Sequence, residues 1–432
     1  MKNYRRFTTA VALRIGAVGS SLVVTVVLTR ALGVSDFGSY AFALAVLTIL
    51  AIPLDAGLPH LVVREVAAAD RANQKDVVKG VLLRGLQLTL LVAPVPLAVY
   101  LVFRMVAPAQ MAAIEGMDYL GIALAALPFV ALVALFGAAL RAFERYFVGQ
   151  VLGILAIRIF HLAVLGLVIL AAGFGALSGA LALWAFVTAN AIAAAIAGVA
   201  LWRQAGYQWH DIVPTFRSRA WAASLLPLTL IAGLQIIVSK TDILMLRALR
   251  GPEDVGLYYV ASQLGNLVFI AKAGVMMVIG PRMARLHSRG HTAAMQTELA
   301  DAARFIVLAG LPVALGILVF GSTFIPWMFG AEFSGAFSAA AILAIGYLCM
   351  GLFGSVETLL KMTGHEGVIL STIVGAIVVN VSLNFALIGP YGPMGAALAT
   401  AITMVLWRAF LTWRAWRILG VVSLAFYRVP RR

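Results

Sequence analysis

The chain has 432 residues, of which 63% are hydrophobic and only 11% are charged, and its mean hydropathy is +1.01. So few charged residues cannot cover the surface of a water-soluble protein of this length, which excludes soluble folds. The formal charge of +15, from 32 basic and 17 acidic residues, accompanies apolar runs near 20 residues long and therefore indicates membrane topology rather than nucleic-acid binding.

Apolar runs long enough to cross a bilayer recur along the whole chain. Hydrocarbon offers an exposed backbone no hydrogen-bond partner, and the runs lack the alternation of barrel strands, so each is predicted to be a helix. The predicted spans are 9–29, 37–57, 80–103, 117–140, 149–171, 176–201, 223–246, 256–279, 304–326, 337–360, 367–389 and 394–413. Pro94, Pro96 and Pro128 predict kinks. We expect an all-α polytopic membrane protein with twelve transmembrane helices.

Basic residues are distributed unequally between the two sets of connections. The side that holds the N-terminus has 22 of them and the opposite side has four, which predicts that both termini are cytoplasmic. The first apolar stretch has no small-residue cleavage pattern before Arg30, so we interpret it as a retained helix and not as a signal peptide. The one cysteine, Cys349, excludes an intramolecular disulfide.

The two halves of the chain share sequence landmarks in the same order. TRALGVSDFGSYAFA from Thr29 is similar to LRALRGPEDVGLYYVA from Leu246, and GFGALSGA from Gly173 is similar to GPYGPMGAA from Gly389. Because an even number of helices separates the copies, both halves are expected to have the same orientation in the membrane. The predicted organisation is an N-terminal six-helix lobe at 1–203, a cytoplasmic linker at 204–222, a C-terminal six-helix lobe at 223–416 and a basic cytoplasmic tail at 417–432.

Charged residues inside the predicted spans are the candidates for function. The basic ones are Arg14, Arg84, Arg158, Lys240, Lys272 and Arg408, and the acidic ones at similar positions are Asp55, Asp242 and Glu357. Each cation facing lipid would cost about 2.5 to 3.5 kcal/mol, so these side chains must face protein, water or headgroups. Arg14 could pair with Asp55, and Asp242 could neutralise Lys240 or Arg247. The acidic residues are therefore candidate charge partners or coupling groups.

Six cations against three anions leave a positive excess even if every such pair forms. A water-filled cavity with this balance favours anions, and phosphate or pyrophosphate on a lipid-linked intermediate is the obvious candidate. The predicted binding residues are Arg14, Arg84, Arg158, Lys240 and Lys272. Arg408 and His161 receive no role. The sequence has no Walker loop, Asp-x-Asp, His/Cys metal spacing or nucleophile triad, so no catalytic residue, metal or cofactor is predicted and transport is favoured over catalysis.

Five segments together resemble a known family. They are RALGVSDFGSYAFA from Arg30, DAGLPHLVVREVA from Asp55, KTDILMLRALRGPEDVGLYYVA from Lys240, MFGAEFSGA from Met328 and NFALIGPYGPMGAALAT from Asn384. In this order they are similar to the polysaccharide biosynthesis or oligosaccharide flippase family, which belongs to the same superfamily as the multidrug and toxin extruders and the lipid II flippases.

The resemblance implies two pseudo-symmetric six-helix lobes around a central cavity that opens alternately to each side. It also implies a cargo, an undecaprenyl-pyrophosphate-linked oligosaccharide that moves to the outer leaflet of a bacterial inner membrane for a polysaccharide polymerase and export machinery. By position, the family's cationic lumen falls on Arg14, Lys240 and Lys272, whereas Arg158 is chosen on burial alone.

Two other functions stay open. A cation-coupled drug antiporter of the same fold would require unpaired carboxylates in its cavity, and a membrane glycan polymerase or transferase would act on a lipid-linked donor.

Overall fold

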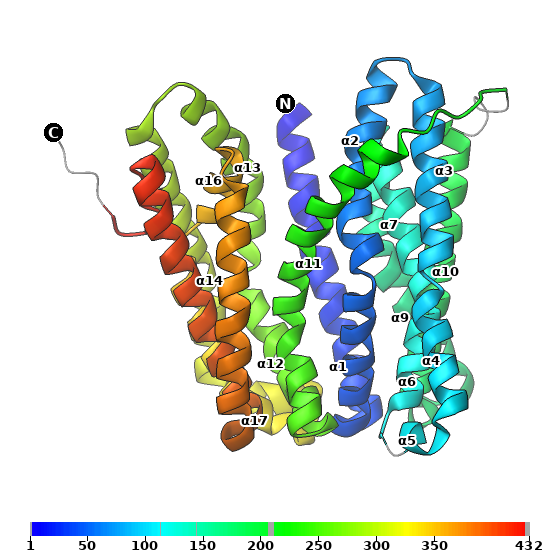
Figure 1. Ribbon diagram of the computed structural model, residues 1–432. Coiled ribbons are helices and arrows are strands. Elements are labelled where there is room, and N and C mark those ends of the chain that lie inside the picture. The colour runs from blue at the N-terminus through cyan, green and yellow to red at the C-terminus, as the bar shows by residue number, and fades with distance from the viewer. Residues whose placement is uncertain (1, 113, 144, 206–210, 428–432) are drawn as a thin grey trace. The chain divides into compact units, whose positions relative to one another are not determined.

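The computed structural model describes residues 2–112, 114–143, 145–205 and 211–427, without the side chains of 2–15, 112, 146, 154, 231, 273, 277 and 278. Every regular element in these residues is a helix (Figure 1), which confirms the predicted all-α fold. The chain forms two compact units. The N-terminal unit is Gly16–Lys240, and the C-terminal unit is Met1–Ile15 together with Thr241–Arg432. The lobe and linker boundaries predicted above remain predictions.

The N-terminal unit is built around α7 and α10, which contact each other and most of their neighbours. Its elements are α1 (Lys2–Leu50), η1 (Pro53–Gly57), α2 (Leu58–Arg71), α3 (Lys75–Val92), α4 (Val95–Val106), α5 (Pro108–Ala112), α6 (Met117–Ala125), α7 (Leu127–Ala142), α8 (Tyr146–Gln150), η2 (Val151–Ala156), α9 (Ile157–Ala172), η3 (Phe174–Ala176) and α10 (Gly179–Ala205). The helix α11 (Ser218–Leu249) follows and ends in the C-terminal unit.

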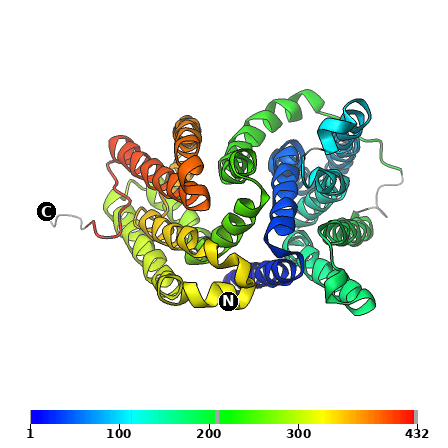
Figure 2. The ribbon, with the colours of Figure 1, turned by 90° about the horizontal axis from the view of Figure 1, so that it is seen from below.

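The C-terminal unit is built around α15, which contacts α12, α14 and α17. Its elements are α12 (Pro252–Val268), α13 (Ile270–Ser288), α14 (Thr292–Phe329), η5 (Ala331–Gly335), α15 (Ala336–Gly351), α16 (Val356–Met362) and α17 (Glu366–Leu419). Viewed from below, α14, α15 and α17 lie side by side (Figure 2).

Many of these helices are long and apolar enough to cross a bilayer. Eight segments of the described chain meet that standard, and a ninth does if the bent pair around η2 is one span. Two long helices, α1 and α17, each contain a glycine with non-helical backbone angles, at Gly33 and Gly392, close to the turns predicted between spans. α17 therefore covers two of the predicted spans, and α1 covers one span and most of the next. The total of twelve remains a prediction.

Prolines and glycines interrupt the helices where backbone chemistry requires it. The α3–α4 break lies at residues 93–94 and the α6–α7 break lies at Ala126, which places Pro96 and Pro128 in the first turns of new helices, where a missing N–H group costs little. Helices are thus interrupted where Pro94, Pro96 and Pro128 predict kinks. Gly33 (φ 71°) and Gly251 (φ 129°) occupy nearly the same place in the two sequence repeats, and both need the left-handed conformations that glycine tolerates.

Two predicted spans of the C-terminal unit also contain breaks, which the sequence did not predict. The span predicted at 256–279 breaks at Phe269, between α12 and α13. The span predicted at 337–360 breaks at residues 352–355, between α15 and α16, where Gly354 has a left-handed φ of 55°. Non-helical backbone at membrane depth occurs only where protein buries it or water reaches it, so such breaks indicate internal or functional surfaces.

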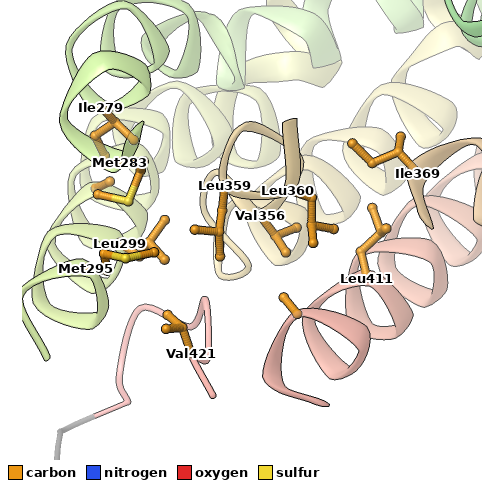
Figure 3. Close-up of a cluster of buried hydrophobic side chains, with 12 residues drawn as sticks. Ile279, Met283, Met295, Leu299, Val356, Leu359, Leu360, Ile369, Leu411 and Val421 are labelled. Atoms are coloured by element: carbon orange, nitrogen blue, oxygen red, sulfur yellow. The ribbon is translucent and has the colours of Figure 1, made fainter. Parts of the chain in front are cut away.

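A buried apolar cluster holds α16 in place (Figure 3). Val356, Leu359 and Leu360 of α16 lie at its centre, each fully buried. The surrounding side chains come from α13, α14, α17 and the segment after α17, and include Ile279, Met283, Met295, Leu299, Ile369, Leu411 and Val421. Because four other parts of the chain contact this short helix, the cluster fixes its position.

The segment after α17 also holds the α15–α16 break, through hydrogen bonds. Gln296 of α14 hydrogen-bonds both the N–H and the carbonyl of Val422. The Ser423 hydroxyl donates to the Phe353 carbonyl at 2.7 Å, and the Ala425 N–H donates to the Leu352 carbonyl at 2.9 Å. Part of the predicted tail is therefore packed structure, and residues 428–432 lie outside the described chain.

We predict that Leu360→Ala lowers the free energy of unfolding by about 2 to 4 kcal/mol, because the substitution leaves a cavity that the packed surroundings fill only partly. Thermal unfolding of the purified protein in detergent measures the effect. The matched control is Leu308→Ala on α14, where the side chain is 67% exposed. Equal losses of stability for the two variants would contradict the role assigned to the cluster.

Candidate functional site

Three charged side chains from different helices meet inside the C-terminal unit. Lys272 is in the first turn of α13, Glu357 is in the first turn of α16, and Arg408 is in the second half of α17. Lys272 Nζ lies 3.4 Å from one carboxylate oxygen of Glu357, and Arg408 Nη2 lies 3.0 Å from the other. We call these three residues the charged triad. Two cations share one anion, so the triad has a formal charge of +1.

Both helix breaks of the C-terminal unit lie directly beside the triad. Lys272 follows the break at Phe269, and its Nζ lies 4.8 Å from the centre of the Phe269 ring. Glu357 follows the break at residues 352–355. The apolar cluster around α16 therefore also determines where the Glu357 carboxylate lies, since Val356 and Leu359 flank it in the sequence.

The triad is nearly, but not fully, closed to the outside. The side chains of Lys272, Glu357 and Arg408 are 13%, 9% and 4% exposed, respectively. Nε and Nη1 of Arg408 have no hydrogen-bond partner among the described residues, nor do the hydroxyls of Ser355 and Thr358 next to Glu357. Buried donors of this kind are costly to leave unpaired. The site therefore has more hydrogen-bonding capacity than its own side chains use, as expected where an anion or water binds.

A second polar group in the same unit surrounds Asp242 of α11. Its carboxylate accepts hydrogen bonds from Tyr258 of α12 and Thr400 of α17, both at 2.5 Å, and from the amide of Asn384 at 2.7 Å. The Asn384 amide also donates to the side-chain oxygen of Asn380 at 3.0 Å. Asp242 is 3% exposed, so three neutral donors satisfy a buried carboxylate and join three helices. Neutral groups, and not Lys240, make the hydrogen bonds to this acid.

The predicted residues of the N-terminal unit do not form one cluster. Arg84 of α3 is exposed; it donates to Gln87 at 3.2 Å, and its guanidinium lies 4.8 Å from the centre of the Phe216 ring. Arg158 is half-buried at the start of α9, directly after the π-helical turn η2. Asp55 is in the π-helical turn η1 with an exposed side chain.

Three further residues complete the set considered from sequence. Lys240 is half-buried on α11. Arg14 belongs to α1, but its side chain lies outside the described residues. His161 is buried, with Nε2 3.3 Å from the carbonyl of Ala182, and is therefore a hydrogen-bonded core residue.

Sequence reasoning found two members of the triad and passed over the third. Lys272 was selected as a buried cation and Glu357 as a charge partner, whereas Arg408, the most buried of the three, received no role. The available signal was its place in the continuous apolar run MVLWRAFL, six residues before the next basic residue. The Asp242 group also depends on Tyr258 and Thr400, which have no distinguishing sequence pattern.

We predict that Asp242→Ala lowers the free energy of unfolding by about 2 to 3 kcal/mol, because three buried donors lose their shared acceptor. Thermal unfolding in detergent checks this value, with Asp70→Ala on the exposed surface of α2 as the control. Wild-type stability of the Asp242 variant would show that the hydrogen bonds to this acid contribute nothing to the fold.

Comparison with known proteins identifies a relative of part of the chain and solved structures with a similar fold. Over 165 residues the chain is 25% identical to the probable low-salt glycan biosynthesis flippase Agl15 of Haloferax volcanii; this match spans 38% of the chain and only 35% of that relative's length. A multidrug resistance MATE family transporter of the MOP superfamily, in an inward-facing conformation, has a TM-score of 0.78 at 13% identity, with 95% of this chain and 98% of that one covered.

The lipid II flippase MurJ, in an inward closed conformation, has a TM-score of 0.73 at 13% identity, with 95% of this chain and 87% of that one covered. At these identities the two structures establish a shared fold and nothing more. A sequence match over residues 8–287, well over half of the chain, is to the family described as "Polysaccharide biosynthesis protein". The chain is a multi-span membrane protein and belongs to the polysaccharide biosynthesis protein family.

Proposed function

We propose that the protein is a flippase that moves a lipid-linked oligosaccharide from the cytoplasmic to the outer leaflet. The observation that supports this most directly is the charged triad, in which two cations share one carboxylate beside two helix breaks. A positive site at membrane depth suits the phosphate groups that join a glycan to its carrier lipid. Family membership and the partial match to a glycan flippase support the same cargo class.

The mechanism follows from the chemistry of such a cargo. The phosphate groups bind the basic site, the hydrophilic glycan needs a water-filled route, and the isoprenoid tail stays in lipid. Alternating access of two lobes, which the sequence resemblance implies, would expose the bound headgroup to each side in turn. The protein acts as a transporter in this proposal and not as an enzyme, since the cargo changes leaflet without changing its bonds.

The finer assignments belong to the proposal as well. The carrier is an undecaprenyl pyrophosphate, the membrane is a bacterial inner membrane, and both termini are cytoplasmic because basic residues concentrate on that side. A polysaccharide polymerase and export machinery would receive the flipped product. Arg14, Arg84, Arg158 and Lys240 join Lys272 as proposed binding residues, and Asp55 joins Asp242 and Glu357 as proposed charge partners or coupling groups.

We predict that Lys272→Ala combined with Arg158→Ala reduces export of the surface polysaccharide by about tenfold or more, because removal of buried charges that contact an anion costs at least 1.4 kcal/mol of binding. Export is measured in cells whose only copy of the gene encodes the variant, with membrane abundance quantified by immunoblot. Arg289→Ala, an exposed position at the end of the same helix α13, is the control. Wild-type export by the double variant at normal abundance would count against the proposed site.

A drug antiporter is the second candidate, because a multidrug transporter shares the fold. It is distinguished by proton- or sodium-driven efflux of a cationic dye from vesicles that contain the purified protein. The buried carboxylates of the C-terminal unit are each engaged by donors or cations, which argues against a free acid for a cationic drug there.

A further inference from the structure

We propose that Arg408 is a positioning residue that holds Glu357 so that Lys272 keeps its positive charge available to the cargo. This inference rests on the proposed function, in which Lys272 contacts the pyrophosphate group. It assigns different tasks to the two cations of the triad, one of which would bind the anion while the other neutralises the acid between them.

The two contacts to Glu357 are not equivalent. Arg408 Nη2 lies 3.0 Å from its carboxylate oxygen, which is a normal charge-assisted hydrogen-bond distance, whereas Lys272 Nζ lies 3.4 Å from the other oxygen. The shorter contact is with the more deeply buried cation. The carboxylate is therefore held chiefly by Arg408.

Arg408 also depends on Glu357 more than Lys272 does. Its side chain is 4% exposed, and Nε and Nη1 have no hydrogen-bond partner among the described residues, so Glu357 is the acid that compensates this buried charge. Removing the acid that pairs with a buried cation strongly destabilises the folded protein. Each cation has an aromatic neighbour, Phe269 at 4.8 Å from Lys272 Nζ and Trp407 at 5.3 Å from the Arg408 guanidinium, so these contacts do not separate them. Lys272 differs in its greater exposure, 13%, which lets water compensate more of its charge.

The formal charges of the triad can therefore be assigned to a neutral pair and one free cation. Arg408 and Glu357 form a neutral buried pair, and the net charge of +1 belongs to Lys272, the member that a ligand reaches most easily. Without Arg408, Glu357 would turn entirely to Lys272, and the site would be neutral. Lys361, half-buried one turn further along α16, remains in every variant considered below and so does not alter the comparison.

The test measures the binding of farnesyl pyrophosphate, a short isoprenoid pyrophosphate, to the purified full-length protein by calorimetry, with farnesol as the uncharged control. The variants are Lys272→Gln, Glu357→Gln, Arg408→Gln and the double variant Glu357→Gln with Arg408→Gln. Each replaces a charged side chain with a neutral polar one, and together they set the triad's formal charge to 0, +2, 0 and +1. Thermal unfolding of each variant is recorded in parallel.

We expect affinity to follow the Lys272 charge that Glu357 leaves free, and not the stability of the variant. Arg408→Gln should weaken binding by roughly thirtyfold, as loss of a charge at a buried ionic site does, and the double variant should return to within about threefold of the wild type. Glu357→Gln should bind within about threefold of the double variant, because Arg408 has no acid left to act through. If Arg408→Gln does not fold, this pair tests the same division of charge, since a direct role of Arg408 would make Glu357→Gln roughly thirtyfold tighter than the double variant.

Two results would overturn the inference. One is wild-type affinity in folded Arg408→Gln, and the other is a double variant that binds as weakly as Lys272→Gln, since either would show that Arg408 does not act through Glu357. Wild-type affinity in Lys272→Gln, or equal binding of farnesol, would instead refute the anion site of the proposed function itself. The two failures are therefore distinguishable.

Discussion

The Glu357 carboxylate, shared between Lys272 and Arg408, is the interaction on which the functional interpretation depends. In a low-dielectric interior each of these charges is expensive alone, and the group is stable only because the three are together. Two cations and one anion cannot cancel, however, so compensation is incomplete. The remaining positive charge would attract the anionic headgroup of the proposed cargo.

Breaks between helices position two of the three charged side chains of the triad, Lys272 and Glu357. α16 begins directly after a break and is surrounded by apolar side chains of α13, α14 and α17, while residues 421–425 tie the break to α14. A continuous helix at this point would place its side chains by helical periodicity alone. The break and its packing instead let Glu357 lie between cations that come from two other helices. The helix break before α16 and the ion pairs of Glu357 therefore depend on each other, because each is costly in the membrane without the other.

Some features followed from the sequence because one residue type determines them. Apolar runs dictate helices in hydrocarbon, and proline lacks an N–H group, so the helices and the interruptions near Pro94, Pro96 and Pro128 were predictable. The break at Phe269 was not, because no glycine or proline marks it.

Buried cations were recognised by their cost in lipid, which brought Lys272 to attention. Arg408 was overlooked because depth along a helix does not reveal whether the side chain faces protein, and its acid lies on another helix. Pairing across helices depends on tertiary packing, which also explains why Tyr258 and Thr400 gave no sign of contact with Asp242.

We propose that movement of the cargo between leaflets requires the positive site in addition to the fold. The most direct test is transbilayer movement of a fluorescent undecaprenyl-pyrophosphate-linked oligosaccharide in vesicles that contain the purified protein, read as loss of fluorescence to a membrane-impermeant quencher. We expect the labelled lipid to cross rapidly with the wild-type protein and at the protein-free rate with Lys272→Gln. Equal, rapid movement with both proteins, or none with a folded wild type, would contradict this proposal.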